Sequence, residues 1–92
     1  LDFPELGSEK MTHFINKPVI ITALGFRKDN LAYPRTMEFE GTSYRFIDAG
    51  LSCIVRQGGL VAQIMTMTDG HQQFKLRSDN RGGSWTLLTM SA

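Results

Sequence analysis

The feature of this sequence that most constrains its fold is a series of short apolar segments separated by turn-forming dipeptides. From Arg35 onward the connectors read GT, AG, GG, DG and DNRGG, and each segment between them has the length of a strand. Such connectors at this spacing are typical of antiparallel hairpins, because glycine and aspartate accept the backbone angles of tight turns. The expected strands are Val19–Phe26, Arg35–Glu40, Ser43–Asp48, Leu51–Arg56, Leu60–Thr68, His71–Ser78 and Ser84–Met90.

The pattern predicts an all-β fold, a strongly bent antiparallel meander of about six to seven strands, with closure into a small barrel as one form of it. Residues 1–92 are expected to form a single domain. Near the N-terminus, Asp2 as an N-cap and Pro4 in the first turn predict one short helix. Residues 1–10 precede Met11 and are interpreted either as a tag remnant or as a flexible N-terminal extension.

Composition and charge exclude several classes of protein. Hydrophobic residues make up 41% of the chain and charged residues 21%, as in ordinary globular domains, and no apolar run is long enough for a membrane helix. The net charge of +1 predicts no strong attraction to phosphate backbones or anionic membranes. The single cysteine excludes an intrachain disulfide. A cytoplasmic location is therefore expected, without contact to membranes.

The hairpins can be assigned registers from their turns. If Gly41 and Thr42 form a two-residue turn, Phe39 faces Tyr44, so that aromatic side chains meet across the strands. The same rule, applied to the other strand positions, places Glu38 opposite Arg45, Met37 opposite Phe46, and Arg35 opposite Asp48.

Two further turns define the faces of the segment Leu60–Met67. A turn at Gly58-Gly59 places Val55 opposite Ala62 and Cys53 opposite Ile64. A type I′ turn at Asp69-Gly70 places Thr68 opposite His71, Met67 opposite Gln72, Met65 opposite Phe74, and Gln63 opposite Leu76. The segment is then apolar on both faces, and each face needs a cover.

Three covers are available for the second face: the N-terminal segment, the sheet curling on itself, or a second subunit. The leading functional hypothesis follows from the third, because small domains often gain stability by association. The chain is interpreted as a non-enzymatic protein-interaction module that forms a homo-oligomer, a dimer first of all, through an apolar sheet face or a free sheet edge. The candidate interface residues are Leu60, Ala62, Ile64, Cys53 and Val55.

Metal binding and catalysis find little support in the sequence. Met65, Met67, Asp69 and His71 are possible ligands by type, but the predicted turn points the methionines and His71 to opposite faces. Cys53 lies within a strand and is interpreted as a buried structural thiol rather than a nucleophile. No catalytic, cofactor-binding or metal-binding residue is assigned, and the protein is predicted not to be an enzyme.

Two alternative functions use other residues. Small β-barrels bind single-stranded nucleic acids with interleaved aromatic and basic side chains. The candidate contacts for this alternative are Arg45, Lys75, Arg77 and Arg81. The second alternative is a barrel that holds a small apolar ligand, lined by residues such as Val61, Met65 and Phe74.

Overall fold

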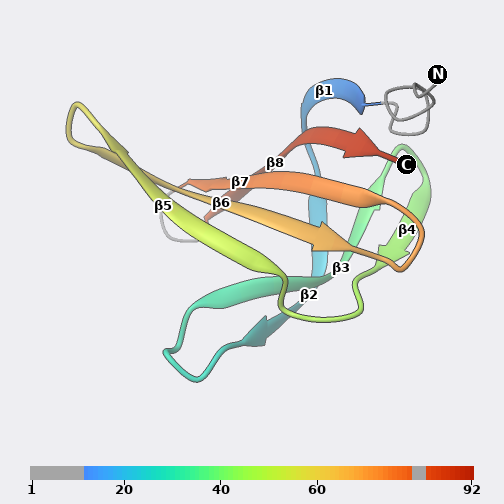
Figure 1. Ribbon diagram of the computed structural model, residues 1–92, viewed down its shortest axis with the longest axis horizontal. Helices are drawn as coiled ribbons and strands as arrows, with labels where there is room; N and C mark the ends of the chain where they lie inside the picture. The colour runs from blue at the N-terminus through green and yellow to red at the C-terminus, as the bar shows by residue number, and fades with distance from the viewer. Residues whose placement is uncertain (1–11, 80–82) are drawn as a thin grey trace, which may run out of the picture.

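The computed structural model describes residues 12–79 and 83–92, which form eight β-strands and no helix (Figure 1). The expectation of an all-β antiparallel fold is confirmed. The strands are β1 (Thr12–Pro18), β2 (Ile20–Phe26), β3 (Ala32–Phe39), β4 (Thr42–Arg45), β5 (Leu51–Gln57), β6 (Leu60–Thr68), β7 (Gln73–Asp79) and β8 (Ser84–Ser91).

The strands form two antiparallel sheets joined by one nearly continuous strand. One sheet has the order β1-β8-β7-β6-β5, and the other has the order β2-β3-β4. Between β1 and β2 the chain passes from one sheet to the other, and the backbone amide of Val19 still donates to the carbonyl of Trp85 at 3.1 Å. Figure 1 shows the blue path of β1 leading directly into β2. The two sheets therefore share a seam at this point.

The hydrophobic core lies between the two sheets. Alternation along β6 and β7 turns Met65, Met67, Phe74 and Leu76 inward, where each is almost fully buried. The remaining core residues come from both sheets and from the segment after β4: Met37, Phe46, Trp85 and Leu87. The rings of Tyr44 and Phe46 meet that of Phe74 edge to face, the geometry that aromatic pairs prefer.

A second crossing between the sheets follows β4. The amide of Ile47 donates to the carbonyl of Thr68 at 3.0 Å, and the amide of Gly50 donates to the Asp48 carboxylate at 2.8 Å. These bonds bring the chain alongside the end of β6 and lead it into β5. Within the described residues the sheets do not close into a barrel, because β5 ends the larger sheet with β6 as its ladder partner.

The turn at Gly58-Gly59 has the predicted register, whereas the turn after β3 does not. Cys53 pairs with Ile64, and Val55 pairs with Ala62. After β3, however, Met37 pairs with Tyr44. The turn residues there are Glu40 and Gly41, both with positive φ. A type I′ turn needs positive φ at both central positions, and the β-branched Thr42 resists it. The pairs predicted around Gly41-Thr42 are thus wrong by two residues.

The register predicted for the hairpin of β6 and β7 is also wrong by two residues. Met67 pairs with Phe74, and Met65 pairs with Leu76. The connection spans four residues because the carboxylate of Asp69 accepts hydrogen bonds from the amides of His71 and Gln72, both at 2.8 Å. A shift of two residues leaves every side chain on its predicted face, so the predicted inward set remains inward.

The strand β1 was not expected from the sequence. Its pairing with β8 shifts between Phe14 and Lys17, where Asn16 has a φ of 54°. Because of this irregularity and the proline at the end of β1, the sequence pattern does not indicate a strand here. The predicted short N-terminal helix, with Asp2 as its N-cap, falls on residues that lie outside the described part of the chain.

Candidate binding surfaces

The outer face of the β5–β6 hairpin is the apolar surface that the alternation of these strands predicts. Leu60, Ala62 and Ile64 share this face with Cys53 and Val55, because the register pairs them across the two strands. Leu60 is 76% exposed and Val55 is 43% exposed. We call these five residues the outer face; in the described part of the chain no strand packs over it.

Within the described residues β5 has no strand partner on the side away from β6, and this free edge borders the outer face. A two-residue hairpin makes its flanking residues, Gln57 and Leu60, a hydrogen-bonded pair, and such pairs alternate along the ladder. The odd-numbered residues of β5 therefore direct their backbone groups toward β6. Ser52, Ile54 and Arg56 direct theirs outward, as a template for another strand. The side chain of Arg27 touches this edge once, donating to the hydroxyl of Ser52 at 2.9 Å.

The inner face of the same hairpin borders a cleft. Figure 1 shows the β5–β6 hairpin and the β2–β3 hairpin extending to the same side of the molecule. Between them lies a cleft of about 440 Å³, which we call the hairpin cleft. Its lining includes Phe26 and Leu31 from the β2–β3 hairpin, and Ile54 and Val61 from the β5–β6 hairpin.

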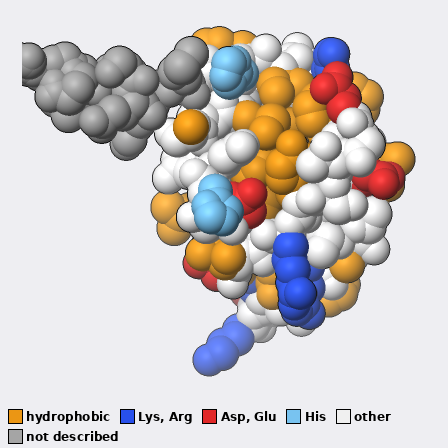
Figure 2. All heavy atoms as spheres, turned by 90° about the vertical axis from the view of Figure 1, so that its right-hand side faces the viewer, with side chains coloured by type: hydrophobic (Ala, Val, Ile, Leu, Met, Phe, Trp, Pro, Cys, Tyr) orange, Lys and Arg blue, Asp and Glu red, His pale blue; other side chains and the backbone are white. Residues whose placement is uncertain are grey.

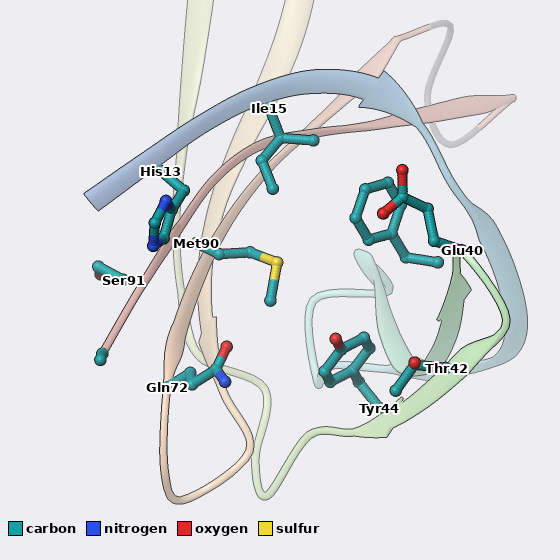
Figure 3. A pocket seen from close by; sticks show the side chains of 10 residues that line it. His13, Ile15, Glu40, Thr42, Tyr44, Gln72, Met90 and Ser91 are labelled. Atoms are coloured by element: carbon teal, nitrogen blue, oxygen red, sulfur yellow. The ribbon is translucent and has the colours of Figure 1, made fainter. Parts of the chain in front are cut away.

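A second concavity opens at the other end of the core, and we call it the end hollow. Its volume is about 370 Å³, and its lining comes from β1, β8, the β3–β4 hairpin and the loop after β6. Figure 2 shows apolar side chains gathered in the middle of this end of the molecule. In Figure 3 the side chains of Ile15, Tyr44 and Met90 border the hollow, while His13 and Ser91 lie at its outer margin. An exposed ion pair, Lys17 with Glu40 at 3.3 Å, joins β1 to the β3–β4 turn.

The structure distributes the candidate nucleic-acid contacts over different surfaces. Arg45 lies in the three-stranded sheet, whereas Lys75 and Arg77 lie on one face of β7 in the other sheet. Arg77 forms an ion pair with Asp79 at 3.2 Å. Arg81 lies outside the described residues. Nucleic-acid binding stays a prediction.

The aromatic residues that this alternative would use for stacking are packed inside. Phe74 is fully buried, and Trp85 and Phe46 are nearly so. Their faces and edges contact the core rather than solvent, so they offer no platform for bases.

The interpretation of Cys53 as a buried thiol is wrong, because its side chain is exposed on the outer face. Alternation correctly assigns Cys53 to the face opposite the core, but no described strand covers that face. The potential metal ligands of the next hairpin also lie apart. Met65 and Met67 are in the core, and His71 is exposed in the loop. The described residues contain no cluster of three or more His, Cys, Asp or Glu side chains that could hold a metal ion.

The residues proposed to line an apolar-ligand cavity lie in different parts of the structure. Met65 and Phe74 are buried in the core and line neither concavity, because side chains from both sheets fill the space around them. Val61 alone of the three lines the hairpin cleft. Sequence reasoning missed the cleft, because its opposite wall comes from the β2–β3 connection, which pairs with neither β5 nor β6.

No helix that could span a membrane occurs in the part of the chain that the structure describes. Comparisons with protein-family models, curated proteins and solved structures give no match to this chain.

Proposed function

We propose that this domain is an interaction module that self-associates through the edge of β5. The observation that supports this proposal most directly is an edge strand that no other described strand pairs with, bordered by an exposed apolar face. Exposed apolar edges of this kind promote strand addition, and proteins usually protect them with charges, prolines or covering elements. In β5 the only charged residue is Arg56, and the strand has no proline.

A second copy of the chain fits this edge by symmetry. Antiparallel pairing of two β5 strands over their full length places a two-fold axis at Ile54. The outward backbone groups then meet each other, Ile54 with Ile54 and Ser52 with Arg56 of the second copy. The two Arg56 side chains do not face each other in this register, so the arrangement avoids a repulsion between like charges.

The same register joins the two outer faces. Cys53 faces Val55 of the second copy across the axis, and the apolar face of each subunit continues into the other. The two five-stranded sheets then form one sheet of ten strands. Leu51, Val55 and Leu60 of both copies form a row of apolar side chains along its centre. Removing this surface from water is the expected driving force of association.

A lysine placed among the apolar side chains at the centre of the proposed dimer tests the proposal. Val55→Lys places two unpaired charges against apolar side chains at the axis, and we expect the dimer dissociation constant to rise at least about tenfold, which is about 1.4 kcal/mol. Sedimentation equilibrium over a range of concentrations measures the constant. Ser84→Lys is the matched control, because Ser84 is exposed in β8 and lies far from the edge. A wild-type protein that stays monomeric at high micromolar concentration would refute the proposal.

A disulfide tests the register itself. Cys53 and residue 55 of the second copy form a pair without backbone hydrogen bonds, with Cα atoms about 4.5 Å apart, within the range that a disulfide can bridge. Val55→Cys should therefore give a covalent dimer on mild oxidation, with Cys53 linked to the new cysteine. Peptide mapping identifies the linked pair. Exclusive linkage of Cys53 to Cys53 would instead place the axis at Cys53.

A further inference from the structure

Two polar side chains lie among the mostly apolar residues that line the hairpin cleft. Gln63 of β6 and Ser78 of β7 lie directly opposite each other in the ladder, and both line the cleft. Gln63 is 9% exposed and Ser78 is 1% exposed. Most of the other lining residues are apolar, with Phe26 and Leu31 from the β2–β3 hairpin and Val61 from β6, while Asn30 and Arg56 are polar.

Each of these two side chains carries a buried polar atom that no described residue satisfies. The Nε2 atom of Gln63 and the Oγ atom of Ser78 are buried, and neither has a hydrogen-bond partner among the described residues. A buried polar group without a partner destabilises the fold, whereas an apolar residue of similar shape would be tolerated at the same position. Two such groups side by side in one concave site indicate a ligand that supplies the missing partners.

The chemistry of the site selects the class of ligand. The amide nitrogen of Gln63 donates, and the hydroxyl of Ser78 can donate as well. Arg56 also lines the cleft and carries the only charge among its described lining residues. Three donors, one of them cationic, favour an anionic acceptor over an amine or an alcohol. The volume of about 440 Å³ lies within the usual range for small-molecule sites, roughly 300–1,000 Å³.

We propose that the hairpin cleft binds a small amphiphilic carboxylate. The carboxylate accepts hydrogen bonds from Gln63 and Ser78 near Arg56, and the alkyl or aryl body lies against Phe26, Leu31 and Val61. This site uses the inner face of the β5–β6 hairpin rather than the outer face, while Ile54 and Arg56 of the β5 edge belong to both proposed surfaces.

Octanoate is a suitable probe, with 1-octanol as its uncharged counterpart. Titration of isotope-labelled protein, followed by amide chemical shifts, should show saturable octanoate binding with shifts centred on Gln63, Ser78 and Leu31. We expect 1-octanol to bind at least about tenfold more weakly, since it cannot use the charge of Arg56. Equal binding of the two would overturn the carboxylate assignment, and no saturable shift with either would overturn the site.

Matched leucine variants separate this cleft from the end hollow. Gln63→Leu should weaken octanoate binding at least about tenfold, because it removes a charge-assisted hydrogen bond. Gln72→Leu makes the same change in the lining of the end hollow and should leave the affinity unchanged. The opposite result, with shifts centred on Gln72 and Met90, would move the binding site to the end hollow and refute the proposal.

Thermal stability distinguishes a ligand-binding role of Ser78 from a structural role, because the two roles predict opposite changes in the melting temperature of a Ser78 variant. Ser78→Ala removes an unsatisfied hydroxyl, so the ligand-free variant should melt at a higher temperature than wild type while it binds octanoate more weakly. If Ser78 instead supports the fold, the variant melts at a lower temperature and its octanoate affinity is unchanged. That outcome would contradict the assignment of Ser78 to a ligand. Sedimentation of Gln63→Leu should still show the wild-type dimer constant, so failure of one proposal leaves the other testable.

Discussion

Gly50 marks the point where the second crossing meets β6, and the site has no space for a side chain. Its φ is +64°, and a Cβ atom added there would collide with the carbonyl oxygen of Thr66 and lie 2.6 Å from the sulfur of Met67. The Thr66 carbonyl belongs to the backbone of β6 and the Met67 side chain is buried, so neither can move away cheaply. The sequence shows a glycine at this position but does not show the strand that approaches it.

The consequence is a measurable difference between two glycines. Gly50→Ala should lower the free energy of unfolding by more than about 2 kcal/mol, because backbone strain and a steric clash add. Gly58→Ala is the matched control: its φ is +57°, but no heavy atom lies within 4 Å of the added Cβ, so only the strain of about 1 kcal/mol applies. Urea titration measures both. Equal losses of stability in the two variants would contradict the close packing of Gly50 against β6.

At the level of the element, the loop between β6 and β7 depends on the charge of Asp69. Burial raises the pKa of the Asp69 carboxyl, but the backbone hydrogen bonds from Gln72 and His71 and the charge of His71 outweigh it and hold the pKa below its ordinary value. A carboxyl whose pKa is lower in the folded state stabilises that state above the pKa of the unfolded chain. This contribution is lost as the pH falls through the folded pKa.

Asp69→Asn should therefore destabilise the domain at neutral pH by a few tenths to about 1 kcal/mol, a small value because the site is close to solvent. The difference from wild type should shrink as the pH falls below about 4, where the carboxyl begins to protonate in the unfolded chain. Thermal melts at a series of pH values test this. Glu38→Gln, on an exposed position of β3, serves as the control for removing a carboxylate outside this loop. A difference that stays constant at low pH would contradict the role of the charge.

The same loop shows how far the sequence can predict the elements. Seven of the strands follow from alternation and turn residues, and the Gly58-Gly59 register follows because glycine at both central positions leaves one choice. The Asp69 connection is longer than predicted because a side chain, rather than backbone preference alone, shapes it. The strand β1 escapes prediction because its identity depends on pairing with β8 far along the chain. Alternation places Cys53 on the correct face, but no local pattern shows what covers that face.

For the molecule as a whole, the seam at Val19 and the shared core predict that the two sheets unfold together. The chain offers a direct test, because its single tryptophan, Trp85, lies in the five-stranded sheet, whereas both tyrosines, Tyr33 and Tyr44, lie in the three-stranded sheet. Tryptophan fluorescence and tyrosine absorbance should therefore give the same midpoint in urea at one protein concentration. Two separate midpoints would show that each sheet is an independent unit.

The pairing of β1 with β8 also bears on how the protein acquires its structure during synthesis. Thr12 pairs with Ser91, so the strand that links the sheets emerges from the ribosome well before its partner strand. Contacts between such distant parts of a chain form slowly, because a large loop must close first. Until β8 pairs with β1, the nascent chain exposes the unpaired edges of both sheets. Docking of β8 thus follows the synthesis of the other seven described strands, and a product truncated before β8 should be the form that chaperones and proteases recognise.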